Sequence, residues 1–169
     1  IDNLAFSNCG NLSKVTLSKK LTELGYGAFY DCDLITEIEI PKSLEKAGHY
    51  LQYYDGPFAK CDGLKKVTFE NGTTKIVGNL FYGCTGLEEI TIPDTITAVE
   101  HSAFNSCTNL SKVTFSKNLT TIDASAFSGN TRLVSVKIPD SVTKIDNLAF
   151  SNCGNLSKVT LSKKLTELG

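Results

Sequence analysis

The chain has 169 residues, 21% of them charged, and a formal net charge of −1. This balance shows neither the basic bias typical of nucleic-acid binding nor an acidic tail, and the longest apolar runs are too short to span a membrane. We therefore expect no nucleic-acid partner and no membrane insertion. The sequence has no methionine and no signal peptide, so we expect it to be a fragment of a longer chain.

The sequence is repetitive at two scales. Residues 1–25 and 145–169 are identical, and a phenylalanine recurs every 23 residues, apart from one spacing of 29. These anchors are Phe6, Phe29, Phe58, Phe81, Phe104, Phe127 and Phe150. A repeat of this length cannot bury its apolar residues alone, so successive copies must stack on one another. The sequence predicts a single array over residues 1–169 with about seven repeats.

The first element of each repeat surrounds the anchor and reads Ala-Phe-x-x-Cys. Its apolar residues are three positions apart, which is the spacing of one helical or 3₁₀ turn. We therefore predict a short helical turn on this side of every repeat.

Six of the seven anchors are followed three residues later by a cysteine, and Asn130 takes this position in the remaining repeat. Stacked strands hold equivalent residues about 4.8 Å apart, farther than the roughly 3.8 Å between the Cβ atoms of a disulfide. We predict free, buried thiols. Disulfides or a metal are the alternatives, although a spacing of 23 residues resembles no zinc motif.

The second element reads Leu-x-x-Val-x-Ile in the consensus, with β-branched residues alternating, and predicts a short strand. Pro41, Pro93 and Pro139 end every second copy. With the charges described next, these prolines indicate a pair of repeats with a period of 46 residues. The expected fold class is α/β but β-rich, a solenoid with a parallel sheet on one side and short helical turns on the other.

The residues between the buried strand positions should point outward and form columns along the array. Eight residues after each anchor the column nearly alternates in sign: Lys14, Glu37, Lys66, Glu89, Lys112, Ser135 and Lys158. Lys66, Glu89 and Lys112 are candidate ligand-binding residues on a charged strip. The alternative is a self-complementary ladder of charges that fixes the register of the strands and keeps the surface soluble, since each such pair contributes little binding energy.

The second repeat carries a six-residue insertion within residues 48–57. Tyr50, Tyr53, Tyr54 and Asp55 form a cluster of the kind that is frequent at recognition surfaces, so we include these four among the candidate ligand-binding residues. The alternative is a tolerated bulge that packs its tyrosines on the array.

The pattern AFxxCxxLxxIxIPxxVxxI resembles the BspA-type class of leucine-rich repeats, and residues 81–99, FYGCTGLEEITIPDTITAV, carry it almost unbroken. The resemblance covers the whole chain and implies a right-handed leucine-rich repeat solenoid with its parallel sheet on the concave face. It also implies a secreted or cell-surface location and a role in adhesion to host matrix proteins and in coaggregation. Asn130 and the insertion depart from the pattern.

No motif of a nucleophilic, metal-dependent or phosphate-binding enzyme is present, so we expect no catalytic activity, metal site or cofactor. The expected function is a surface-exposed or secreted binding module whose partner is a protein or a glycan. The alternative is a structural spacer in a long repeat protein, with units that stack head to tail.

Overall fold

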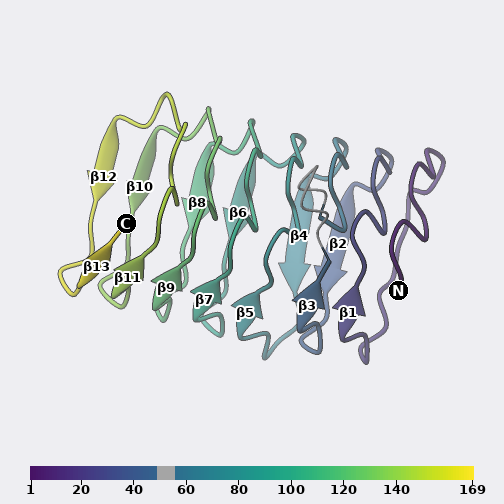
Figure 1. Ribbon diagram of the computed structural model, residues 1–169, viewed down its shortest axis with the longest axis horizontal. Coiled ribbons are helices and arrows are strands. Elements are labelled where there is room, and N and C mark those ends of the chain that lie inside the picture. The colour runs from purple at the N-terminus through teal and green to yellow at the C-terminus, as the bar shows by residue number, and fades with distance from the viewer. Residues whose placement is uncertain (49–55) are drawn as a thin grey trace.

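The computed structural model describes residues 1–48 and 56–169, and it is a parallel β-solenoid (Figure 1). We call each circuit that starts at an anchor phenylalanine a coil, and number the coils 1 to 7. From coil 2 onward each coil has a long strand: β2 (Glu37–Ile40), β4 (Lys66–Phe69), β6 (Glu89–Thr91), β8 (Lys112–Thr114), β10 (Ser135–Lys137) and β12 (Lys158–Thr160).

The anchor phenylalanines form one stack along the array axis. Successive rings are 5.1–5.9 Å apart between centroids and lie within 20° of parallel. The central anchors Phe58, Phe81, Phe104 and Phe127 are fully buried. The predicted common interior of the stacked repeats is therefore present, and it holds the strands on its surface at fixed spacing.

A second ladder of two-residue strands runs along the lower edge of Figure 1 and was not predicted from the sequence. Its strands are β1 (Glu23–Leu24), β3 (Lys46–Ala47), β5 (Lys75–Ile76), β7 (Ala98–Val99), β9 (Thr121–Ile122), β11 (Lys144–Ile145) and β13 (Glu167–Leu168). Strands β5, β7, β9, β11 and β13 form one continuous parallel sheet, and β1 pairs with β3. Threonines reinforce it: the Thr120 hydroxyl donates to the Thr97 carbonyl oxygen at 2.9 Å, and Thr166 does the same to Thr143 at 3.0 Å.

The predicted helical turns at the anchors are wrong, since residues 1–48 and 56–169 contain no helix. In six of the seven segments the residue two positions before the anchor and the residue two positions after it adopt the left-handed conformation; around Phe104 these are Ser102 (φ 52°) and Ser106 (φ 58°). At Phe58 only the residue two positions after the anchor, Lys60, does so, with φ 56°. The N–H groups of Ser102, Ser106 and Phe104 point to the next coil and donate to Ala124, Ser128 and Ala126. The segment therefore joins neighbouring coils by hydrogen bonds. Its own bonds, such as that from the Asn105 N–H to the Ser102 carbonyl oxygen, close isolated turns that do not continue into a helix.

The left-handed conformation is costly for a leucine, and Leu148 adopts it at φ 60° while 63% exposed. Asn79 occupies the equivalent position two residues before Phe81, with φ 58°. Asparagine tolerates this conformation better, so Leu148→Asn should stabilise the fold by about 1 kcal/mol. Urea denaturation would measure this. A Val134→Asn control, at an exposed position with ordinary φ, should show no such gain, and equal effects of the two variants would contradict the explanation.

The long strands pair in twos, with the 46-residue period indicated by the sequence. Hydrogen-bonded ladders join β2 to β4, β6 to β8 and β10 to β12. Within the described residues no ladder joins residues 13–17 of coil 1 to β2, β4 to β6, or β8 to β10. In this order we call these three unpaired interfaces seam 1, seam 2 and seam 3.

The prolines account for one missing hydrogen bond at each seam. Inside the first pair, the Glu70 N–H donates to the Ile40 carbonyl oxygen at 2.9 Å. Pro41, Pro93 and Pro139 occupy the position of Glu70 in their own coils, and proline has no N–H to donate. Each proline-ended strand is bonded to the coil that follows it and not to the one before, and its proline removes one of the donors that a ladder on that side would need.

This pairing predicts an alternation in backbone hydrogen exchange. The N–H groups of Glu89 and Thr91 face seam 2, because Ile92 in the same strand donates the other way, to Thr114 at 2.8 Å. The N–H groups of Lys112 and Thr114 instead face β6, to which β8 is hydrogen-bonded. We expect markedly faster amide exchange at Glu89 and Thr91 than at Lys112 and Thr114, measured by NMR. Equal protection on both sides of β6 would contradict the seam.

Candidate functional site

The outward surface of the long strands is the most regular exposed feature of the molecule, and we call it the long-strand face. Strand β2 shows how it forms: Glu37 and Glu39 are exposed while Ile38 and Ile40, 3% and 2% exposed, enter the core. Alternation along a strand sends successive side chains to opposite sides. The face therefore consists of the residues eight and ten positions after each anchor, as the sequence predicts.

The candidate residues Lys66, Glu89 and Lys112 lie on this face in ion pairs. The Lys66 Nζ atom is 3.4 Å from Glu37 Oε2, and Lys112 Nζ is 3.4 Å from Glu89 Oε2. All four side chains are 67–70% exposed, so each pair contributes little to stability and exchanges readily for another partner. Both pairs lie within bonded strand pairs, an arrangement that agrees with the charge-ladder alternative and leaves ligand binding open.

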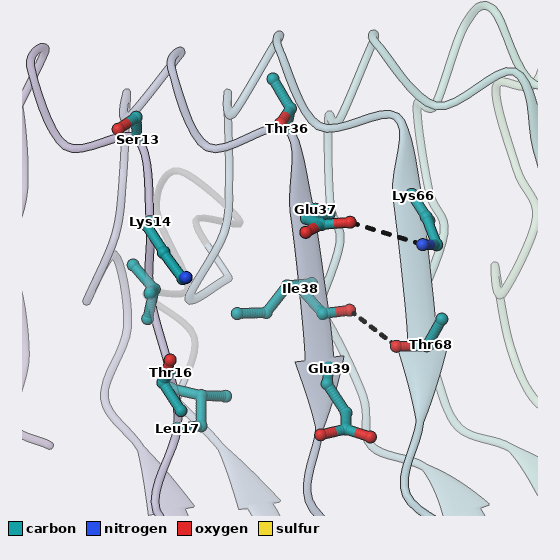
Figure 2. A pocket seen from close by; sticks show the side chains of 11 residues that line it. Ser13, Lys14, Thr16, Leu17, Thr36, Glu37, Ile38, Glu39, Lys66 and Thr68 are labelled. Carbon is teal, nitrogen blue, oxygen red and sulfur yellow. Dashed lines mark hydrogen bonds and ion pairs between the residues drawn. The ribbon is translucent and has the colours of Figure 1, made fainter.

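A groove opens at seam 1, with a volume of about 360 Å³. Figure 2 shows Lys14 and Thr16 on one side, and Glu37 and Glu39 on the other. The groove extends across β2 to Lys66 and Thr68, and the Thr68 hydroxyl donates to the Ile38 carbonyl oxygen at 3.5 Å. Its walls thus offer ammonium, carboxylate, hydroxyl and backbone groups together.

Similar grooves border the other two seams. One of about 410 Å³ at seam 2 is lined by Lys65, Glu88, Glu89, Ser111 and Lys112. A larger one of about 580 Å³ at seam 3 includes Thr114, Lys137 and Thr160 among its lining residues. Each of the three hollows is centred on an even-numbered coil and reaches both of its neighbours, so it spans one seam and one hydrogen-bonded interface.

Sequence reasoning missed some members of this surface and selected others that lie elsewhere. Lys14, Glu39, Lys137 and Lys158 are exposed on the same face and were not selected, although their columns contain the signal. The seam grooves had no sequence signal beyond the alternating prolines. The tyrosine cluster and Asp55 in the insertion, at Tyr50, Tyr53 and Tyr54, lie outside the described residues.

The cysteine column is structural. All six thiols are free, and five are buried while Cys9 is partly exposed. Each buried thiol donates to the carbonyl oxygen of the preceding anchor, as Cys107 does to Phe81 at 3.2 Å. Burial raises the pKa of Cys61 and of Cys107 to about 12, so both thiols stay protonated and unreactive at neutral pH.

Asn130 fills the cysteine position of coil 6 in an equivalent way. Its amide nitrogen Nδ2 donates to the carbonyl oxygens of Phe104 at 3.1 Å and Phe127 at 2.8 Å. The side chain is fully buried, and its Oδ1 atom has no hydrogen-bond partner. What the column requires is therefore a small buried donor aimed at the preceding anchor carbonyl.

Residues 1–48 and 56–169 contain no cluster of three or more His, Cys, Asp or Glu side chains placed to hold a metal ion. No helix in this part of the chain is long and apolar enough to cross a membrane.

Among solved structures, the chain is similar to three bacterial leucine-rich repeat proteins. The protein from Eubacterium ventriosum is 30% identical, with a TM-score of 0.72, and the match covers 95% of this chain and 40% of that one. The protein from Bacteroides ovatus is 26% identical, with a TM-score of 0.58 and coverages of 86% and 42%. The protein from T. pallidum, 24% identical with a TM-score of 0.59 and coverages of 92% and 64%, shows the fold alone. The chain thus spans about two fifths to two thirds of their lengths.

No curated protein matches the chain detectably in sequence. The family model described as the BspA type leucine rich repeat region matches residues 1–56 and 52–169, in six copies. The matched segments include both identical ends, the insertion and every seam. Together with the parallel solenoid and the buried Phe and Cys columns, this match shows that the chain belongs to the BspA-type leucine-rich repeat family.

Proposed function

We propose that the chain is a non-catalytic binding or adhesion module, presented in a secreted or cell-surface protein, whose contact surface is the long-strand face. The observation that carries the proposal is that face itself: a column of exposed Lys, Glu and Thr side chains hollowed at regular intervals by the seam grooves. A surface of this kind can contact an extended partner at several points at once.

The scaffold beneath the face favours binding without large rearrangement. The stacked anchors and the sheet formed by β5, β7, β9, β11 and β13 fix the positions of the strands. A preorganised surface loses little conformational freedom when a partner binds, which raises affinity. Membership of the BspA-type family, in which surface placement is frequent, supports an extracellular location.

A binding screen with charge-reversal variants tests the proposal. The chain would be screened against matrix proteins and extracellular glycans, and any binder retested with the Lys66→Glu, Lys112→Glu double variant. We expect micromolar binding by the native chain and its loss in the double variant. Lys20→Glu is the matched control, because Lys20 is exposed but lies beyond the strand, outside the face. Binding that survives the double variant would exclude this face as the contact surface.

The insertion is a second place where the partner could bind. Tyr53→Ala and Tyr54→Ala variants separate the two surfaces. A partner that is lost with these variants, and kept by the Lys66→Glu, Lys112→Glu variant, would assign recognition to the insertion.

The second candidate function is a structural spacer whose units stack head to tail. The identity of residues 1–25 and 145–169 favours it. Sedimentation velocity over a wide concentration range would show growing oligomers, reduced in a Phe6→Asp variant. A monomer at every concentration would exclude self-stacking.

A further inference from the structure

Every odd-numbered coil presents the same Lys-Val-Thr triplet on the long-strand face. The four copies are residues 14–16, 66–68, 112–114 and 158–160. In each copy the lysine and threonine are exposed. The valine between them is 8% exposed at Val67, partly buried at Val15 and Val113, and 48% exposed at Val159. The even-numbered coils read Glu-Ile-Glu, Glu-Ile-Thr and Ser-Val-Lys instead. The face thus carries an ammonium and a hydroxyl group that recur together every second coil.

The spacing of the triplets is set by the core. Phe rings of successive coils are 5.3–5.5 Å apart from Phe81 to Phe150, and hydrogen-bonded strands lie about 4.8 Å apart, so consecutive triplets on the face recur about every 10 Å. A linear partner that contacted them all would need one anionic group per two coils, always on the same side. It would also have to lie along the array axis, across the strands.

Polypeptides fit this spacing poorly. An extended strand advances about 3.3 Å per residue and alternates its side chains between two faces, so the same face returns every 6.6–6.8 Å or so. A polyproline II chain returns to the same face every three residues, after roughly 9.3 Å. The extended strand does not match two coils. The polyproline II repeat comes closer but falls short of two coils, and the shortfall grows along the array.

Polysaccharides of β-linked pyranose rings fit better. Such a chain advances by about one coil per sugar, so a disaccharide spans two coils. Where one of the two sugars is a uronic acid, the polymer carries one carboxylate per disaccharide, and this carboxylate would face the lysine of each triplet. Ring hydroxyls would face the threonines, and in seam 1 the groove lies directly between the triplets of coils 1 and 3, in contact with both.

The charges on the face vary along the array, and the C-terminal end offers an anionic partner the most favourable set. Glu37 and Glu89 compete for Lys66 and Lys112 in exposed ion pairs. In coil 6 the position of these glutamates is taken by Ser135, and Lys137 is added beside it. The surface over β8, β10 and β12 therefore combines three outward lysines, at 112, 137 and 158, with no carboxylate in the two face columns of these coils.

We propose that the long-strand face binds a linear acidic polysaccharide that carries one carboxylate per disaccharide, aligned along the array with one disaccharide per two coils and held most strongly over β8 to β12. This inference rests on the proposed role of the face in binding, and it names the class of partner.

Defined oligosaccharides of alternating uronic acid and N-acetylhexosamine test the proposal by calorimetry. We expect affinity to rise with each added disaccharide, from the disaccharide to the octasaccharide. Lys112→Ser and Lys158→Ser should each weaken octasaccharide binding about five-fold, the effect of losing one exposed ion pair. Glu89→Ser should strengthen it, and Lys20→Ser, outside the face, should leave it unchanged. Thermal unfolding of each variant checks that the fold is intact.

Two comparison polymers separate alignment from simple charge attraction. Neutral β-1,4-linked N-acetylglucosamine oligomers have the spacing without the charge, and polyglutamate has the charge without the spacing. Both should bind more weakly than the acidic oligosaccharide. Binding of polyglutamate as tight as that of the octasaccharide, or affinity that does not rise by disaccharides, would overturn the proposal.

The test also distinguishes this inference from the function on which it rests. If no polysaccharide binds while a protein partner is still lost in the Lys66→Glu, Lys112→Glu variant, the polysaccharide proposal is wrong and the binding role of the face stands. If neither class of partner binds to the face, both are wrong.

Discussion

The Phe104→Ala variant is expected to lose about 3–5 kcal/mol of unfolding free energy, the usual cost of removing a fully buried phenylalanine. Phe104 is 0% exposed and stacks on Phe81 at 5.4 Å and on Phe127 at 5.3 Å. Its loss opens a cavity in the middle of the stack and weakens the interfaces on both sides. Because a solenoid is stabilised by such interfaces between neighbours, urea denaturation should show the loss directly.

Phe6→Ala is the matched control for this variant. Phe6 stacks on Phe29 in the same geometry, at 5.3 Å, but it is 43% exposed. Its replacement should therefore cost well under half as much. Equal losses for the two variants would mean that the stack does not carry the stability of the array.

Asn130→Leu is expected to destabilise the fold by about 1–3 kcal/mol, because it leaves the buried carbonyl oxygen of Phe104 without a donor. The leucine is similar in size but cannot donate to Phe104, whereas the carbonyl oxygen of Phe127 still accepts from the Cys153 thiol. The measurement is again urea denaturation. Amide hydrogen exchange in the adjacent coils would show where the structure is weakened.

Asn130→Cys is the comparison variant for Asn130→Leu. A thiol at this position can donate to Phe104, as Cys107 does to Phe81, and it removes the unpartnered Oδ1 atom of the asparagine. We expect its stability to lie within about 1 kcal/mol of that of the native chain. If cysteine were as damaging as leucine, the hydrogen bond to the anchor carbonyl would not be what the column requires.

The repeat architecture was readable from the sequence because its signal is periodic and redundant. Seven anchors with matching columns of Cys, Leu and Val leave only stacked coils as a way to bury them all. The alternation of buried and outward residues in strands such as β2 also placed the candidate lysines and Glu89 on an exposed face. These inferences needed only the period of the pattern and the need to bury apolar groups.

The parts that the sequence did not predict depend on where single hydrogen bonds go. The spacing of Ala-Phe-x-x-Cys fits a helical turn, but left-handed residues such as Ser102 and Ser106 direct the N–H groups to the next coil. The short strands contain two residues each, too few for an alternation to be visible. The seam grooves arise from strand pairing, to which the missing donor of Pro93 or Pro139 contributes, and composition alone carries no trace of their shape.

The pairing of the long strands has a consequence for how such an array can lengthen or shorten during evolution. Gain or loss of two adjacent coils leaves every proline-ended strand beside the partner that bonds to it, with Lys-Val-Thr strands still alternating. Gain or loss of one coil instead places two strands of the same kind next to each other, which disturbs both the bonding and the sequence of charges. Copy number should therefore change by even steps, so that a family of such arrays would differ in length by multiples of about 46 residues.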